Sequence, residues 1–312
     1  MDIGVWEIPE IFFLNFTSHH TRSNYRRDIT QFFIFLMKNY PKVQTFKEIS
    51  IDHVLHYRNN LMEIGGPKGD KACNKTISRK LASLSSLFKF LISKSELEHN
   101  PVATLKRPKP TAKKPTQALQ IEHVNSILRL AKANKTSGPL HYFLLVAFFS
   151  TGLRKSEILF RKVKDIQKHA DFWVLEYEAK GGKRGIKRLT PLFMEAFENY
   201  KSWMNENERE FGLEDWLFQP SRNPSDPDYL NKPLNPKTIN EIISSYAKKL
   251  SLGRVTPHSA RATFITHLLE IGVDLFSVSH EVGHASVTTT QIYDKRRVEL
   301  KNSPVDKLKI SA

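Results

Sequence analysis

The stretch "TPHSARATFITHLLEIG", residues 256–272, begins with a clean helix start. Thr256 can cap the helix, and Pro257 suits the first turn because its fixed φ angle is already helical. A buried face is predicted from apolar residues at helical spacing, namely Phe264, Ile265, Leu268 and Leu269. His258 and Arg261 are three residues apart and project from one face near the positive end of the helix dipole. The sequence therefore predicts a phosphate site here, with a capping histidine and a surface arginine as the alternative.

A second arginine stands in "TGLRKSE", residues 151–157, at the edge of an apolar helix predicted near 140–149. Arg154 follows a glycine turn, and its guanidinium can grip two phosphate oxygens at once, which a lysine cannot. One interpretation is a simple salt bridge between Arg154 and Glu157. The other is a guanidinium aimed at the same phosphate and braced by Glu157.

Two interpretations also compete for "HEVGHASVTTTQIY", residues 280–293. His280 and His284 have the spacing of a zinc-protease helix. Against this, Gly283 would lie inside that helix, where glycine costs about 1 kcal/mol relative to alanine, so a helix end is favoured. Tyr293 is instead a candidate nucleophile, and because a phenol ionises near pH 10 it needs dense positive charge to favour the phenolate. Taken alone, this tyrosine is better interpreted as a half-buried aromatic.

The composition narrows the kinds of partner and the cellular compartments that are expected. The 312 residues allow two domains, and a net charge of +16, from 48 basic against 32 acidic residues, favours a polyanion such as nucleic acid. Cys73 is the only cysteine, so no intrachain disulfide is possible, which suits a reducing cytoplasm. The start lacks the basic lead of a signal peptide, and the apolar run at 142–149 is too short to span a bilayer, so a cytoplasmic protein without a membrane partner is predicted.

The first part of the chain, residues 1–100, reads as a helical domain. Helices are predicted over 21–39, after Ser50, and along a stretch that includes Ile77 and Leu91. The other face of the third helix carries Lys75, Arg79 and Lys80, which are either a solvated surface or contacts to DNA phosphates. A basic, proline-rich linker is predicted over 101–117.

The second domain is predicted over 118–298, followed by a tail over 299–312. Its helices are expected near 121–131, 140–149, 193–203 and 237–250, and from Pro257 onward. Between them, "DFWVLEYEAKGGKRGIKRLTPL" predicts two antiparallel strands that turn at Gly181 and Gly182. The expected fold class is mainly α with one small antiparallel sheet.

Together these motifs resemble the tyrosine recombinase (phage integrase) family. "TGLRKSE" is similar to its first arginine box, "TPHSARATFITHLLEIGVDL" to its H-x-x-R box, and "VGHASVTTTQIY" to its closing tyrosine box. The hairpin resembles the lysine-bearing hairpin of the family, and the first domain resembles its SAM-like core-binding domain. The chain departs from the usual pattern at four positions, Arg161, Ala262, Glu281 and Val282.

The resemblance implies a role for each matching position. Arg154 and Arg261 would clamp the scissile phosphate, while His258 and His284 would hydrogen-bond it and assist proton transfer. Tyr293 would attack the phosphorus. Lys180 would protonate the leaving 5′ oxygen, with Lys183 in reserve. No metal and no cofactor is expected, because the arginines and histidines would supply the positive charge.

The activity implied is that of a site-specific DNA recombinase or integrase, which cuts and rejoins strands through a 3′-phosphotyrosyl intermediate. The expected partners are double-stranded DNA with short inverted core sites and three further copies of the chain, as a homo-tetramer on the synapse. Three alternatives remain at this stage: a type IB topoisomerase-like enzyme, a DNA-binding protein without catalysis, and an HExxH zinc protease. The tail is expected either to dock on a neighbouring copy or to fray.

Overall fold

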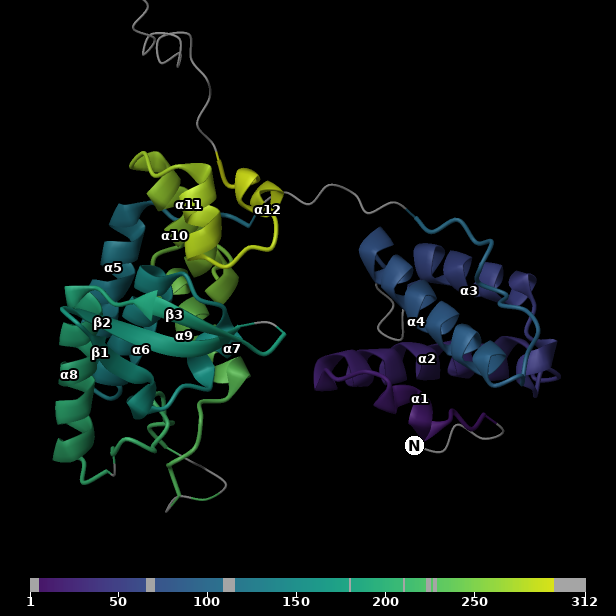
Figure 1. Ribbon diagram of the computed structural model, residues 1–312, viewed down its shortest axis with the longest axis horizontal. Coiled ribbons are helices and arrows are strands. Elements are labelled where there is room, and N and C mark those ends of the chain that lie inside the picture. Colours follow the sequence, from purple (N-terminus) through teal and green to yellow (C-terminus); the bar gives the residue numbers. More distant parts are fainter. Residues whose placement is uncertain are drawn as a thin grey trace, which may run out of the picture. The chain divides into compact units, whose positions relative to one another are not determined.

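The computed structural model describes residues 6–65, 71–108, 116–179, 181–209, 211–222, 226 and 229–294. The chain divides into two compact units, Met1–Lys114 and Pro115–Ala312 (Figure 1). Helices dominate both units in the described part, and one three-stranded antiparallel sheet lies in the second. The predicted fold class is thereby confirmed. None of the described helices is both long enough and apolar enough to cross a bilayer.

In the described part of the first unit, four α-helices surround an aromatic core. Its helices are α1 (Glu10–Leu14), α2 (His19–Asn39), α3 (Ile51–Glu63) and α4 (Asn74–Ser93). The long helices α2 and α4 pack against each other and bury Phe32, Phe33 and Phe88 completely. Trp6 stacks on Phe33 with ring centroids 4.6 Å apart, so the chain before α1 closes one end of this core.

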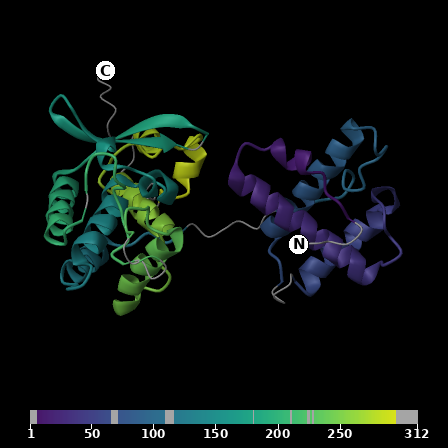
Figure 2. The same cartoon turned by 90° about the horizontal axis from the view of Figure 1, so that it is seen from below.

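The second unit is built around α6, which is apolar on every side and therefore buried. Its elements are α5 (Ile121–Lys132), α6 (Gly138–Thr151), α7 (Lys155–Leu159), β1 (Ile166–His169), β2 (Phe172–Ala179), β3 (Lys183–Arg188), α8 (Pro191–Glu206), α9 (Pro236–Lys249), α10 (Pro257–Glu270), α11 (Leu275–Glu281) and α12 (Val287–Gln291). Helices α5, α8 and α10 all pack on α6. In Figure 2 the hairpin of β2 and β3 extends along one side of this helical core.

The sheet contains one strand more than the sequence predicted. β2 and β3 form the expected hairpin, with Ala179 opposite Lys183 and Val174 opposite Arg188. β1 adds to the other side of β2, with Ile166 opposite Leu175. Its residues are mostly exposed and it has only four of them, so it carries no clear alternation of apolar and polar side chains.

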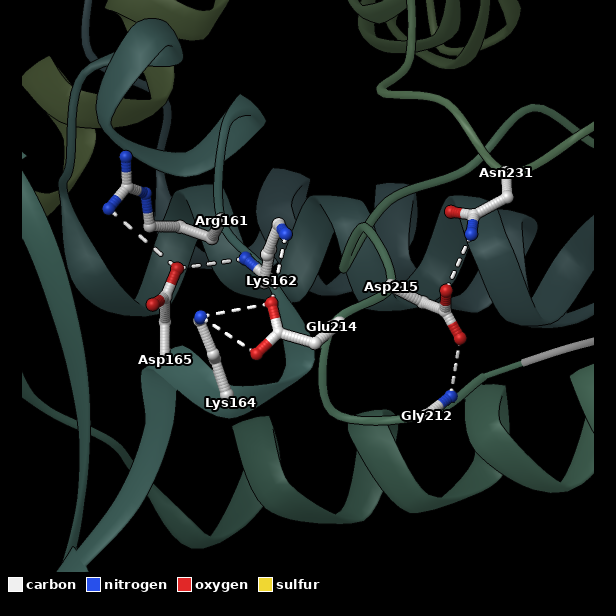
Figure 3. A network of polar contacts seen from close by, with 8 residues as sticks. All are labelled: Arg161, Lys162, Lys164, Asp165, Gly212, Glu214, Asp215 and Asn231. Atoms are coloured by element: carbon white, nitrogen blue, oxygen red, sulfur yellow. Dashed lines mark hydrogen bonds and ion pairs between the residues drawn. The ribbon is translucent and has the colours of Figure 1, made fainter.

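A polar network fastens the loop after α8 to the segment before the sheet (Figure 3). Glu214 accepts hydrogen bonds from Lys162 at 3.0 Å and from Lys164 at 2.8 Å. Arg161 pairs with Asp165 at 3.7 Å, so the residue that departs from the first arginine box has a structural partner. The two exposed pairs of Glu214 contribute at most about 1 kcal/mol each, so they chiefly fix the position of the loop.

Candidate active site

The start of α10 brings two of the predicted residues to the site. Thr256 Oγ1 accepts a hydrogen bond from the Ser259 backbone N–H at 3.3 Å, and Ser259 Oγ accepts one from the Thr256 N–H at 3.1 Å. This reciprocal cap fixes the first turn, as predicted from the sequence. His258 is exposed on that turn, whereas Arg261 lies on the second turn with only 2% of its surface exposed.

Arg261 is fixed from two sides by backbone carbonyls. Its Nη1 donates to the Gly152 oxygen at 2.8 Å, and its Nη2 donates to the Val282 oxygen at 2.5 Å. Burial, with a smaller effect from the charge of Arg154, lowers the pKa of Arg261 to about 10, so the guanidinium stays charged at neutral pH. The surface-arginine alternative is therefore wrong for Arg261.

Gly152 makes this arrangement possible. It ends α6 in the left-handed region at φ +62°, and a Cβ there would lie 2.4 Å from the ring of Phe264. The turn therefore presents its carbonyl to Arg261 and directs the chain into Arg154, two residues on.

Arg154 and Glu157 form the braced pair that the sequence suggested. Glu157 is 2% exposed and accepts from the Arg154 backbone N–H and from Arg154 Nη1, each at 2.7 Å. The Nη2 of Arg154 reaches the Gly283 oxygen at 3.3 Å. Arg154 therefore makes the salt bridge of the first interpretation and is braced as in the second, while its contact with a phosphate stays a prediction.

The segment that resembled a zinc-protease helix is broken at the expected glycine. α11 ends at Glu281, and Gly283 has φ +61°. The Gly283 N–H donates to His280 O and the His284 N–H to Ser279 O, each at 3.0 Å, which is a Schellman end. His280 and His284 therefore do not share a helix. Within the described ranges, no group of three or more His, Cys, Asp or Glu side chains is placed to hold a metal ion.

His284 is an uncharged hydrogen-bonding group at neutral pH. Its Nδ1 lies 2.8 Å from Thr290 Oγ1. Burial lowers its pKa to about 4, with further lowering by the charges of Arg261, Arg154 and His258. These electrostatic interactions show that the side chains converge from α10, the turn after α11 and the turn after α6.

Tyr293 lies in the same neighbourhood but is sheltered. It is 5% exposed and belongs to a small apolar cluster with Ala262, Ile265 and Val282, among others. Burial raises its pKa, and the nearby charge of Arg261 offsets this only in part. In the free chain the phenol is therefore protonated at neutral pH, and the expected effect of positive charge is outweighed by desolvation.

The hairpin contributes a lysine that the sequence interpretation missed. Lys180 lies outside the described residues, and Lys183 is exposed at the start of β3. Lys187, further along β3, is 3% exposed and donates to the backbone oxygen of Glu281 and, at 2.8 Å, to its carboxylate Oε1. Burial lowers the pKa of Lys187, and Glu281 acts in the opposite direction. Glu281, which departs from the family pattern, is therefore paired with Lys187.

The three residues predicted to contact DNA differ in their surroundings. Lys75 is exposed on α4. Arg79 and Lys80 both pair with Asp28, which is fully buried on α2, and Lys80 also binds Gln31. For Lys80 the structure therefore shows neither a solvated nor an outward-facing position but a buried ion pair. The role of all three on DNA stays a prediction.

A tyrosine recombinase is the class of enzyme that this fold and site define. The chain belongs to the phage integrase family, whose model matches residues 117–299. The model for the phage integrase N-terminal SAM-like domain matches residues 15–95. The chain is accordingly a site-specific DNA recombinase, an enzyme that cleaves and rejoins DNA strands.

Similar proteins include several Xer recombinases. The chain is 27% identical over 277 residues to the tyrosine recombinase XerD of Halalkalibacterium halodurans, covering 88% of this chain and 87% of the relative. It is 30% identical over 281 residues to XerD of Oceanobacillus iheyensis, with coverage of 88% and 87%.

Two solved structures share the fold. The XerH recombinase in a post-cleavage complex with a palindromic difH substrate has a TM-score of 0.71 at 19% identity, covering 91% of this chain and 80% of that one. A lambda integrase dimer bound to a COC′ core site has a TM-score of 0.68 at 17% identity, with coverage of 93% and 94%.

Proposed function

We propose that Arg154, Arg261, His258 and His284 bind one scissile phosphate of duplex DNA, and that Tyr293 attacks it. One observation carries this proposal. Arg261 and Arg154 donate to successive carbonyls, those of Val282 and Gly283, in the turn directly before His284. Two fixed guanidiniums beside one neutral imidazole suit a phosphodiester, whose transition state gains negative charge on its oxygens.

The chemistry is two transesterifications that conserve bond energy. The Tyr293 oxygen forms a bond to phosphorus as the bond from phosphorus to the 5′ oxygen breaks, which leaves a 3′-phosphotyrosyl ester. The phenol gives up its proton to a histidine of the site, His258 or His284, and the 5′ oxygen takes one from a lysine of the hairpin, Lys180 or Lys183. A 5′ hydroxyl from the partner duplex then reverses the attack, so no ATP is consumed.

The burial of Tyr293 adds a requirement. The Tyr293 side chain is 5% exposed and packs in an apolar cluster, so we expect the segment that carries it to move when DNA binds. This segment is short: α12 comprises Val287–Gln291, and Tyr293 follows it after one residue, Ile292. The same movement would relieve the desolvation that raises the pKa of the phenol.

The finer assignments of partner and assembly belong to the same proposal. Residues 1–100 would bind core DNA and 118–298 would carry catalysis, with 101–117 as the linker between them. Four copies would assemble on two duplexes with short inverted core sites, and the tail, 299–312, would dock on a neighbouring copy. The net charge of +16 and the DNA-bound state of the XerH and lambda integrase structures support a duplex DNA partner, and we place the enzyme in the cytoplasm.

A nicked suicide substrate tests the proposal. Wild-type protein should accumulate a covalent DNA adduct, and Tyr293→Phe should bind the same DNA with unchanged affinity but form none. Exchange of strands between two labelled duplexes separates a recombinase from a type IB topoisomerase-like enzyme, which would rejoin only the original strand. An adduct that survives Tyr293→Phe would overturn the assignment of the nucleophile.

A further inference from the structure

Three successive carbonyls at the end of α11 each accept a hydrogen bond from a different cationic side chain. Glu281 O accepts from Lys187 Nζ, Val282 O from Arg261 Nη2 at 2.5 Å, and Gly283 O from Arg154 Nη2 at 3.3 Å. Carbonyls at this end of a helix lack helical partners and carry the negative end of the dipole, so they suit cations. One turn therefore holds both proposed phosphate-binding arginines and one further cation.

Lys187 is enclosed rather than directed at solvent. It is 3% exposed, and its Nζ lies 5.6 Å from the centre of the Phe264 ring. Ile186, its neighbour on β3, is 58% exposed, because successive residues of a strand point to opposite faces. The strand thus places an isoleucine outward and a lysine inward, and a buried ammonium is tolerated only when it is fully paired.

Glu281 completes that pairing and ties β3 to α11. Its carboxylate Oε1 lies 2.8 Å from Lys187 Nζ, and its side chain is 48% exposed. Lys187 therefore binds both the backbone and the side chain of the same residue. A cation held by two acceptors on one residue restricts how the turn after it can shift.

We infer that Lys187 and Glu281 are a positioning pair that fixes the 281–284 turn and, through it, the spacing of the two guanidiniums and His284. The inference rests on the proposed function, in which those groups bind the scissile phosphate. Lys187 acts through the turn and does not touch the phosphate. Loss of the pair should slow cleavage without weakening DNA binding.

The experiment measures single-turnover cleavage of a nicked suicide substrate at saturating protein, together with the DNA dissociation constant and the thermal midpoint. Lys187→Met keeps the volume of the side chain but removes the donor. We expect cleavage to fall about 10- to 100-fold, as for other groups that orient a catalytic residue from outside. The DNA dissociation constant should stay within about twofold, because the side chain is enclosed.

Two substitutions of Glu281 should reduce cleavage by different amounts, and a substitution of a lysine elsewhere serves as the control. Glu281→Leu leaves the backbone acceptor in place, so a loss of about three- to tenfold is expected, and Glu281→Gln should lose less because an amide oxygen still accepts. Lys162→Met removes a paired but 33% exposed lysine, whose partner is Glu214 at 3.0 Å, and should leave cleavage unchanged.

A substrate with sulfur in place of the leaving 5′ oxygen distinguishes positioning from proton donation. A thiolate leaves without a proton because thiols ionise near pH 8.5. If Lys187 positions the turn, Lys187→Met stays equally slow on this substrate. If the sulfur restores its rate, Lys187 is a proton donor and the inference is overturned.

Other results also overturn it. Cleavage by folded Lys187→Met within twofold of wild type would do so, as would a loss of cleavage matched by an equal loss of DNA affinity. If Lys187→Met does not fold, Glu281→Leu decides, and cleavage within twofold of wild type then refutes the pair. Failure of the proposed function is separate, because wild-type protein would then form no adduct at all.

Discussion

The brace between Glu157 and Arg154 gives the sharpest mutational prediction. Glu157→Gln keeps the size of the side chain but has one acceptor oxygen where the carboxylate has two. The native oxygens accept separately, from the Arg154 N–H and from Arg154 Nη1, each at 2.7 Å. In the variant an amide NH₂ must face one of these donors, so one contact is lost and Arg154 is no longer held along both of its ends.

The size of the effect follows from burial. The Glu157 side chain is 3% exposed and that of Arg154 is 35% exposed, so the pair is only partly screened by solvent. A hydrogen bond to a charged group contributes about 1.5–3 kcal/mol, and partial exposure argues for the lower end, about 1.5–2 kcal/mol. If that orientation energy is felt in full in the transition state, cleavage falls roughly 10- to 30-fold.

Single-turnover cleavage at saturating protein is the assay, because it removes effects on binding. Asp165→Asn is a matched control: Asp165 accepts from the Lys162 backbone N–H at 2.8 Å and pairs with Arg161 at 3.7 Å, in a network that includes none of the proposed catalytic residues (Figure 3). It should cost similar stability and leave cleavage unchanged. Wild-type cleavage by Glu157→Gln, or an equal loss in Asp165→Asn, would refute the bracing role.

Four further outcomes are expected. Gly152→Ala should lower the free energy of unfolding in urea by about 1–3 kcal/mol and slow cleavage, because φ is +62° and the added Cβ meets Phe264 at 2.4 Å. The pKa of His284 is about 4 in the folded protein, below the usual 6.5, so the unfolded state binds more protons and stability should fall as pH drops from 6.5 toward 4. In urea unfolding at pH 7 and pH 5, His284→Asn should lose less free energy of unfolding on acidification than wild type; an equal loss would contradict the lowered pKa of His284. Of Lys180→Ala and Lys183→Ala, the one that removes the proton donor should be slow on ordinary DNA and recover on the 5′-sulfur substrate; recovery by neither places the donor elsewhere. Cleavage should persist in EDTA, and its loss there would revive a metal-dependent mechanism.

The parts of the site that follow local rules could be predicted from the sequence. The cap at Thr256, the glycine end at Gly283 and the three-residue spacing of Arg154 and Glu157 each depend on neighbours within one turn of the chain. Such contacts are fixed once the helix forms. The two-stranded hairpin was predictable for the same reason, because Gly181 and Gly182 supply its positive φ angles.

Long-range pairing explains what the sequence could not show. Nothing near Lys187 in the sequence distinguishes it from the other cations of the hairpin, yet it is buried because Glu281, 94 residues later, pairs with it. Lys80 lies three residues from Ile77 and four from Leu84, on the apolar stripe of its helix, and it is buried because Asp28 on α2 compensates its charge. The helical period would have flagged Lys80, whereas the alternation in β3 would have predicted Ile186 inward instead of Lys187, and only the fold identifies the partner of either lysine.

The identity of the attacking residue is the most direct test of the mechanism. Wild-type protein trapped on a suicide substrate can be digested with protease, and the peptide that carries the nucleotide can be located by mass spectrometry. We expect the nucleotide on Tyr293, joined through a 3′ phosphate. Attachment to any other residue, or through a 5′ phosphate, would contradict the mechanism proposed here.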